Sequence, residues 1–339
     1  MKTIRRMLRT SLLCLTGLML CGVLLSVYNI GKFDNLEGRY SSLHKADDTS
    51  RTEKRGTLVG SLTILRNPCP EVGLTLVSAF FDLGEFVKGE ERRTVEDYLS
   101  WSEAFRHVFN RLVFYTDSQK FAQHIGSLRS GMVPDLTHII VVNRSELWSF
   151  KLRDPIARLY SKQDYPNYPP NTEVPEYSCA MHSKYACLED AMSRHPPLVT
   201  SQFVAWIDIG YFRDLGNTTA DYCVTPPKEI SETKVLFNQV FRPDFSLTPR
   251  DIFYTDRVWV GGGMFLGARV AMVTFCAEYR RTVTFFLFQR HLCSTDQQTL
   301  YASATQEGKR EVNLSAGIDV TPEINEWFWL GRSLLRQVR

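Results

Sequence analysis

The sequence lacks most of the short motifs that identify common classes of enzyme and binding protein. It has no Gly-x-Ser-x-Gly of serine hydrolases, no Gly-Lys-Ser/Thr of a P-loop, no Cys-x-x-Cys and no internal repeat. It also lacks a basic block, because the net charge is only +3 and four cations lie in the first ten residues. These absences disfavour a hydrolase, a P-loop protein, a zinc site and a nucleic-acid-binding surface.

One apolar run without charge, residues 12–30, is long enough to approach the thickness of a bilayer core. The four cations precede it and charges of both signs follow it, so the positive-inside rule places the N-terminus in the cytosol. We therefore predict a cytosolic tail (1–11), a transmembrane signal anchor in the lipid bilayer (12–30), a polar stem (31–72) and a lumenal domain (73–339). The alternative is a cleaved signal peptide, although a small-x-small cleavage site is poorly matched here.

Cysteines and sequons agree with a lumenal domain. Six of the eight cysteines follow the apolar run, and in an oxidising lumen they could form up to three disulfides. Their spacing does not reveal the pairing, except that Cys179 and Cys187 cannot bond to each other if they share a helix. Three Asn-x-Ser/Thr sequons, at Asn143, Asn217 and Asn313, could carry glycans.

The apolar pattern after residue 73 predicts strands that alternate with helices. We expect strands at 73–81, 111–117, 137–142, 203–209 and 258–266, and helices at 94–110, 118–128, 177–194, 268–281 and from a cap at 294–295 onward. Residues 147–176 form a long excursion, and 214–256 a mixed insertion. Such alternation is typical of βαβ units. The sequence therefore predicts one α/β domain with a mixed, mostly parallel sheet and helices on both faces.

The strand predicted at 203–209 carries the strongest candidate for a functional residue. Asp208 comes at its carboxyl end, which is where open α/β sheets bind ligands. Its carboxylate could hold Mn²⁺ or Mg²⁺ against a substrate diphosphate, because these hard cations take oxygen ligands. The second carboxylate that often follows two residues later is replaced here by Gly210. The alternative is a core strand whose aspartate only caps the next turn.

Glycines mark two further candidate sites. Gly262 and Gly263 belong to a glycine-rich strand that could let the backbone approach a sugar or a phosphate, or could mark a β-bulge. Asp82 and Gly84 follow the first predicted strand, where they could contact a nucleotide or simply turn the chain.

Two charged residues complete the candidates. Lys184 lies on the helix predicted before the Asp208 strand, where it could contact phosphate oxygens or be an ordinary surface lysine. Asp296 opens a predicted helix, where it could orient an acceptor hydroxyl as a general base or only interact with the helix dipole.

In their order along the chain these motifs resemble those of the HtrL/YibB family, a group of glycosyltransferase-like proteins known mostly from bacteria. The matching stretches span about residues 73–335 and are Thr75-Leu-Val-Ser-Ala-Phe-Phe-Asp-Leu-Gly84, Pro175-Glu-Tyr177 with the Lys184 helix, Val204-Ala-Trp-Ile-Asp-Ile-Gly-Tyr211, Gly262-Gly-Met-Phe-Leu-Gly267 and Asp296-Gln297. The same order is similar to that of metal-dependent GT-A glycosyltransferases, although the second acid and a clear C-terminal histidine ligand are missing here.

The resemblance implies a Rossmann-like domain of GT-A type that takes a nucleotide-sugar donor and a glycan, lipid or protein acceptor. By carry-over, Asp296 lies near the acceptor and Asp208 near a metal or the donor, and the donor site also includes Asp82, Gly84, Lys184, Gly210, Gly262 and Gly263. With the anchor, this predicts a type II membrane glycosyltransferase of the Golgi or ER. The alternative is a catalytically inactive protein of the same fold that binds a glycan or a nucleotide sugar.

Overall fold

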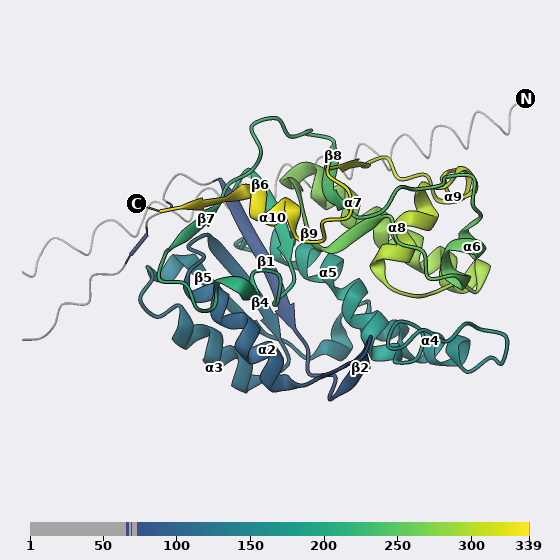
Figure 1. Cartoon of the computed structure of the whole chain (residues 1–339), viewed down its shortest axis with the longest axis horizontal. Coiled ribbons are helices and arrows are strands. Elements are labelled where there is room, and N and C mark those ends of the chain that lie inside the picture. The colour runs from purple at the N-terminus through teal and green to yellow at the C-terminus, as the bar shows by residue number, and fades with distance from the viewer. Residues whose placement is uncertain (1–65, 68, 70–72, 339) are drawn as a thin grey trace, which may run out of the picture. The chain divides into compact units, whose positions relative to one another are not determined.

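The centre of the protein is a seven-stranded sheet in which six strands are parallel and β9 runs antiparallel (Figure 1). The structure, a computed structural model, describes residues 66, 67, 69 and 73–338. In spatial order the strands are β10 (Gly317–Val320), β8 (Lys234–Gln239), β9 (Val260–Ala268), β6 (Phe203–Ile207), β1 (Leu74–Phe80), β4 (Arg111–Thr116) and β5 (Thr137–Val141). Two small sheets accompany it, β2 (Phe86–Lys88) with β3 (Glu91–Arg93) and β7 (Tyr222–Val224) with β11 (Leu335–Gln337).

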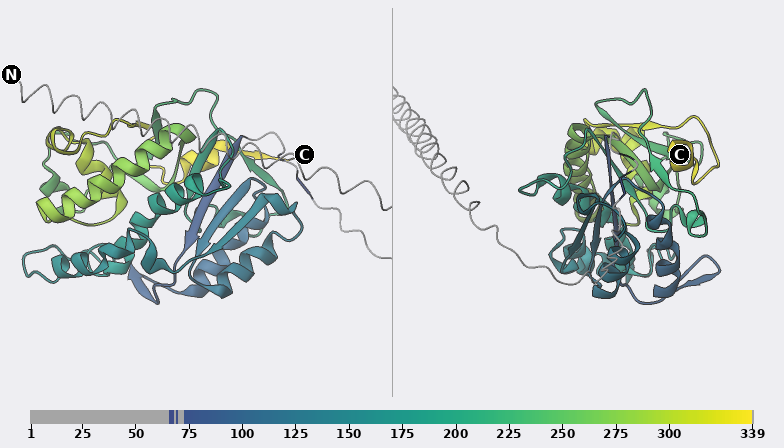
Figure 2. Two further views of the ribbon diagram at one scale, coloured as in Figure 1. Left: turned by 180° about the vertical axis from the view of Figure 1, so that it is seen from behind. Right: turned by 90° about the vertical axis from the view of Figure 1, so that its left-hand side faces the viewer.

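Helices cover both faces of the sheet (Figure 2). They are α2 (Val95–Ser102), α3 (Gln119–Leu128), α4 (Arg153–Tyr160), α5 (Pro175–Ser193), α6 (Pro249–Tyr254), α7 (Arg269–Phe285), α8 (Asp296–Ala304), α9 (Gln306–Val312) and α10 (Trp329–Leu334). Successive strand residues point to opposite faces, so Leu76 of β1 joins the buried cluster under α2, α3 and α10, whereas Val77 joins the cluster under α5, α7 and α8. This two-sided burial explains why the strands read as apolar runs.

The strand order creates a switch point between β1 and β6. The chain runs outward from β1 to β4 and β5, and β6 then pairs with the opposite side of β1. In open α/β sheets, ligands bind in the crevice outside the carboxyl ends of the strands at such a point. Asp82 and Gly84 follow β1, and Asp208 directly follows β6. The topology therefore brings these two predicted segments to the same edge of the sheet.

The predicted α/β class, with a mostly parallel sheet and helices on both faces, is confirmed. The five expected strands are present within two residues of their predicted bounds. The helix expected at 94–110 is shorter than predicted, because α2 ends at Ser102 and the chain continues as a 3₁₀ turn, Glu103–Arg106. Ser102 Oγ donates to the Leu99 carbonyl at 2.7 Å, a local side-chain bond of the kind that competes with helix continuation.

The predicted tail (1–11), the anchor (12–30) and nearly all of the stem (31–72) lie outside the described residues. No helix in the described part of the chain is long and apolar enough to cross a bilayer. Cys69 and Cys223 form one disulfide, and four cysteines are free and buried, namely Cys179, Cys187, Cys276 and Cys293. Asn143, Asn217 and Asn313 are all exposed, as a glycan would require.

Candidate functional site

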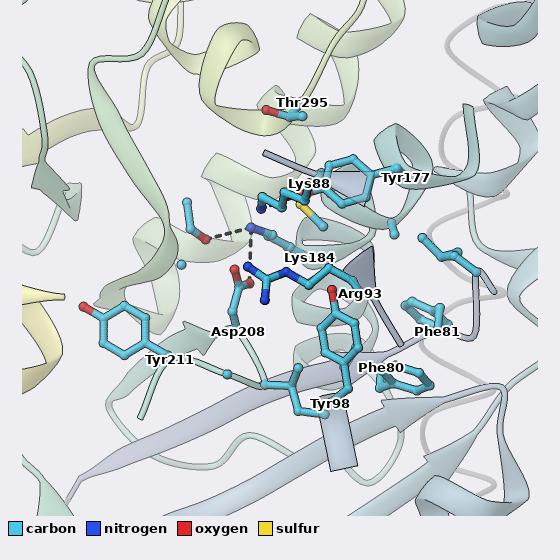
Figure 3. A pocket seen from close by; sticks show the side chains of 18 of the residues that line it. Phe80, Phe81, Lys88, Arg93, Tyr98, Tyr177, Lys184, Asp208, Tyr211 and Thr295 are labelled. Carbon is cyan, nitrogen blue, oxygen red and sulfur yellow. Dashed lines mark hydrogen bonds and ion pairs between the residues drawn. The ribbon is translucent and has the colours of Figure 1, made fainter. Parts of the chain in front are cut away.

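A cavity of about 390 Å³ opens at the carboxyl ends of β1 and β6 (Figure 3). Its walls come from the end of β1, the β2–β3 hairpin, α2, α5, the turn after β6, the glycines of β9, the start of α8 and the residues before α10. The volume is in the range of ordinary small-molecule sites. The switch point of the sheet is therefore also the place where a ligand fits.

The ammonium of Lys184 lies in the inner wall of this cavity. The side chain is only 2% exposed, and Nζ donates to the Gly262 carbonyl at 2.8 Å. Nζ also lies 3.2 Å from Asp208 Oδ1 and 3.1 Å from Asp296 Oδ2, so three oxygens surround its three protons. Burial alone would lower the pKa of Lys184, but the two carboxylates outweigh burial and raise it. The alternative of an ordinary surface lysine is wrong.

Asp208 is the accessible carboxylate of the cavity, with a side chain that is 39% exposed. Strand alternation places Trp206 on the same side of β6, and its Nε1–H donates to Asp208 Oδ1 at 2.7 Å. Lys184 contacts that same oxygen, whereas no described group donates a hydrogen bond to Oδ2. Asp208 is thus held by Oδ1 and leaves Oδ2 free for a ligand.

Asp296 begins α8 as predicted, but its carboxylate is only 1% exposed. The contact of Oδ2 with Lys184 is an ion pair whose angle does not make a hydrogen bond. Burial raises the pKa of Asp296 and Asp208 adds to the rise, while Lys184 opposes it. Asp296 therefore contacts Lys184 at the cavity wall, and its role toward an acceptor hydroxyl stays a prediction. The predicted cap also differs, because the Thr295 hydroxyl bonds Gln298 and not the helix backbone.

Glycines of β9 allow this packing. A Cβ at Gly262 would collide with the Asp296 carboxylate, and one at Gly263 would lie 3.0 Å from the Tyr211 ring. The pairing of β8 with β9 also shifts register here, between Phe237 and Asn238, so the β-bulge interpretation of the run holds as well. The run brings the backbone close to the acids of the site.

The surroundings of Asp208 do not fit the predicted Mn²⁺ or Mg²⁺. A Cβ at Gly210 would lie 2.9 Å from Trp101 Cε3, so a second carboxylate cannot stand there without displacing the indole. The neighbouring carboxylate, Asp296, is already paired with the Lys184 ammonium. Among the residues that the structure describes, no group of three or more His, Cys, Asp or Glu side chains is arranged to hold a metal ion. The two carboxylates of the site, Asp208 and Asp296, are thus arranged around a lysine ammonium and not around a metal ion.

Three cations of the cavity were not predicted from the sequence. Lys88 Nζ donates to Tyr177 Oη at 2.8 Å, and Arg93 lies over the Trp101 ring at 4.9 Å. Arg213 lies between Trp101 and Phe328, at 5.4 and 5.3 Å from their ring centres. In the sequence these residues appear only as an Arg-Arg pair and as single cations between predicted elements. Such cations are common on any protein surface, so they did not indicate a binding site.

Aromatic side chains form much of the remaining wall. They include Phe80, Phe81, Tyr98, Trp101, Tyr177, Tyr211, Trp327 and Phe328. Burial raises the pKa of Tyr98 to about 12, so its phenol stays protonated and can donate a hydrogen bond at neutral pH. Flat apolar faces next to donors suit the rings of a sugar or a nucleobase.

The predicted site residues do not all reach the cavity. Gly84, Lys184, Asp208, Gly210, Gly262, Gly263 and Asp296 line it, but Asp82 does not. Asp82 Oδ1 accepts from the Gly84 N–H at 3.0 Å, and the Asp82 N–H donates to Asp117 Oδ1 at 2.9 Å. Gly84 has φ +73°, a conformation that favours glycine. These contacts agree with the alternative prediction, in which Asp82 turns the chain.

Fold and site together define a mixed α/β protein with a cation-rich cavity at the switch point of a mostly parallel sheet. The chain belongs to the HtrL/YibB family, since the model of that family, described as a bacterial protein of unknown function, matches residues 72–320. The family predicted from the motifs is thus confirmed. No curated protein matches the chain in sequence. Among solved structures, the Q189E active-site mutant of LgtC is similar at a TM-score of 0.35 and 12% identity, over 73% of this chain and 72% of that one.

Proposed function

We propose that the protein is a glycosyltransferase that binds a nucleotide-sugar donor in this cavity and transfers the sugar to a glycan, lipid or protein acceptor. The observation that carries the proposal is the charge pattern of the cavity. Four cations, Lys88, Arg93, Lys184 and Arg213, line it together with two acids, of which only Asp208 is accessible. A net positive wall favours a diphosphate, and one free carboxylate oxygen can serve the reacting sugar.

The proposed reaction assigns one step to Asp208. The acceptor hydroxyl attacks the anomeric carbon of the donor sugar, and the bond from that carbon to the diphosphate oxygen breaks with its electron pair. Asp208 Oδ2 takes the proton of the attacking hydroxyl, as a general base. The nucleoside diphosphate leaves as an anion toward the cationic wall. Trp206 and Lys184 position Asp208, and Asp296 positions Lys184.

The second candidate is a catalytically inactive protein that binds a nucleotide sugar or a glycan. It is favoured by the contacts of Asp208 Oδ1, because the Trp206 Nε1–H and the Lys184 ammonium already occupy that oxygen and only Oδ2 is left for a reacting group. Donor binding without donor hydrolysis or transfer would identify this alternative.

We also propose that the protein is anchored as a type II membrane protein in the Golgi or ER with the cavity on the lumenal side. Support comes from the uncharged run at 12–30, the Cys69–Cys223 disulfide, and the exposure of the three sequon asparagines. Glycosidase treatment of the protein expressed in cells, followed by gel mobility, measures whether Asn143, Asn217 and Asn313 carry glycans.

Donor hydrolysis and transfer by the full chain test the proposed activity across the common nucleotide sugars. We expect Asp208→Asn to reduce turnover by about 100-fold or more, the usual contribution of a general base. Asp214→Asn is the matched control, because Asp214 is close in sequence but is ion-paired with Arg332 outside the cavity lining. Parental turnover by a folded Asp208→Asn protein would overturn the role of Asp208.

A further inference from the structure

The β2–β3 hairpin presents one charged face to the cavity. Directly paired residues of an antiparallel hairpin share a face, so Phe86 with Arg93 and Lys88 with Glu91 lie on one side, and Val87 with Arg92 on the other. Phe86, Lys88 and Arg93 line the cavity. Val87 is 52% exposed and the Arg92 side chain 72% exposed, on the opposite face. The alternation thus places Lys88 and Arg93 on the cavity side of the hairpin and Arg92 on the opposite side.

Contacts with the cavity wall and, for Arg93, an ion pair with Glu91 at 2.6 Å hold the two cations in place. Phe86 packs edge-on against the Tyr177 ring at 5.3 Å. Lys88 lies beside the same tyrosine (Figure 3) and donates to its hydroxyl. Arg93 stacks over Trp101, the residue that packs against Gly210. The two cations therefore approach the cavity from the side that faces Lys184 and Asp208.

Lys88 has donor capacity that no described group uses. Its one hydrogen bond in the described part of the chain, to Tyr177, leaves two of three ammonium protons free. Burial lowers the pKa of Lys88, and the nearby cations Lys184 and Arg93 lower it further, while Tyr98 and Asp208 oppose them. A bound anion would relieve this crowding of positive charge.

Lys184, in contrast, is already neutralised by the acids of the site. Its ammonium donates to the Gly262 carbonyl, forms ion pairs with Asp208 and Asp296, and lies between the two acids that a divalent cation would need. A leaving diphosphate must therefore be neutralised by other cations, and not by Lys184 or by a metal ion bound at Asp208.

We propose that the β2–β3 hairpin is the diphosphate-binding element of the cavity, with Lys88 and Arg93 neutralising the diphosphate of a nucleotide in place of a divalent metal, whose position between Asp208 and Asp296 is filled by Lys184. The inference rests on the proposed donor. It adds two binding residues on an element outside the main sheet and removes the metal from the donor site.

Titration calorimetry of the full chain with inorganic pyrophosphate, and with UDP, GDP and ADP, tests this inference in EDTA and again in Mn²⁺. We expect affinity to be the same within about twofold in the two buffers. Lys88→Gln and Arg93→Gln should each weaken binding by about tenfold or more, as expected for the loss of a charged hydrogen bond. Arg92→Gln, on the outer face of the same hairpin, should bind as the parent does. Lys88→Arg and Arg93→Lys keep the charge and should retain most of the affinity.

Binding that appears only with Mn²⁺ would overturn the inference, as would equal effects of Arg92→Gln and Arg93→Gln, or no binding of any of these anions. The proposed function fails separately. Pyrophosphate bound through Lys88 and Arg93 without turnover of any nucleotide sugar leaves the inference intact and overturns the transferase. Turnover of a nucleotide sugar that depends on Mn²⁺ supports the transferase and overturns the inference.

Discussion

Lys184 is the residue on which both predicted acids depend. Its ammonium is the cation that contacts Asp208 and Asp296, and it is buried with Asp296. Removing one partner of a buried pair leaves an uncompensated charge, which costs more than the pair contributes. The arrangement therefore makes the stability of the domain and the geometry of Asp208 depend on the same side chain.

Lys184→Met should lower the free energy of unfolding by about 3–5 kcal/mol, because it leaves a buried carboxylate without its cation. Urea denaturation followed by circular dichroism measures the change. Lys88→Met is the matched control, since Lys88 forms no ion pair with the described residues and its loss leaves no buried carboxylate without a cation. We expect that substitution to cost less than about 1 kcal/mol. Equal losses of unfolding free energy in the two variants would mean that the ion pairs of Lys184 do not stabilise the domain.

The stability lost in Lys184→Met should also depend on pH. Burial already raises the pKa of Asp296, and loss of Lys184 removes the effect that opposes the rise. Between the ordinary value of 3.8 and the raised value, the folded state binds more protons than the unfolded state, so stability increases as pH falls. In the parent, the raised pKa of Lys184 keeps its contribution complete below about 10.5. Denaturation at pH 7 and pH 4 should show that the difference in the free energy of unfolding between the parent and Lys184→Met is smaller at pH 4. The double variant Lys184→Met/Asp296→Asn should show the same difference from the parent at both pH values.

At the scale of elements, the long apolar strands could be predicted and the short or reversed ones could not. Burial on both faces makes β1, β4 and β6 continuous apolar runs that are visible in sequence. The antiparallel direction of β9 depends on its pairing with β6 and β8, which no local pattern records. The β2–β3 hairpin has three-residue strands, too short for a periodic signal, so Lys88 and Arg93 were missed.

Gly262→Ala tests the close approach of β9 to α8. The added Cβ would collide with the Asp296 carboxylate, and overpacking of this kind costs about 1–3 kcal/mol. Gly261→Ala is the matched control one residue earlier, where the nearest atom is a methyl carbon of Val240 at 3.2 Å, a milder contact than the one at Gly262. Chemical denaturation should show the larger loss at position 262. A smaller loss at 262 than at 261 would mean that Asp296 can move away from β9.

At the scale of the whole molecule, the site depends on topology more than on any one motif. The chain brings Gly84, Lys184, Asp208, Gly262 and Asp296 from five elements to one cavity. Their order could be recognised from the sequence, and the switch point explains why Asp208 and Gly84 meet. The burial of Lys184 and Asp296 could not be predicted, because a lone lysine or a helix-start aspartate is usually exposed. Only the packed structure shows that each is the partner of the other.

The Cys69–Cys223 disulfide joins two segments 154 residues apart, before β1 and in β7, next to the ion pair of Arg66 with Asp221. A cross-link over so long a loop restricts the unfolded chain, so Cys69→Ser/Cys223→Ser should lower the free energy of unfolding by about 2–5 kcal/mol. Denaturation with and without dithiothreitol provides the control. The reductant should destabilise the parent to a similar degree and leave the double variant unchanged. If the reductant changes both proteins equally, another thiol–disulfide pair carries the effect, and the link between β7 and the start of the domain is not what stabilises this end of the fold.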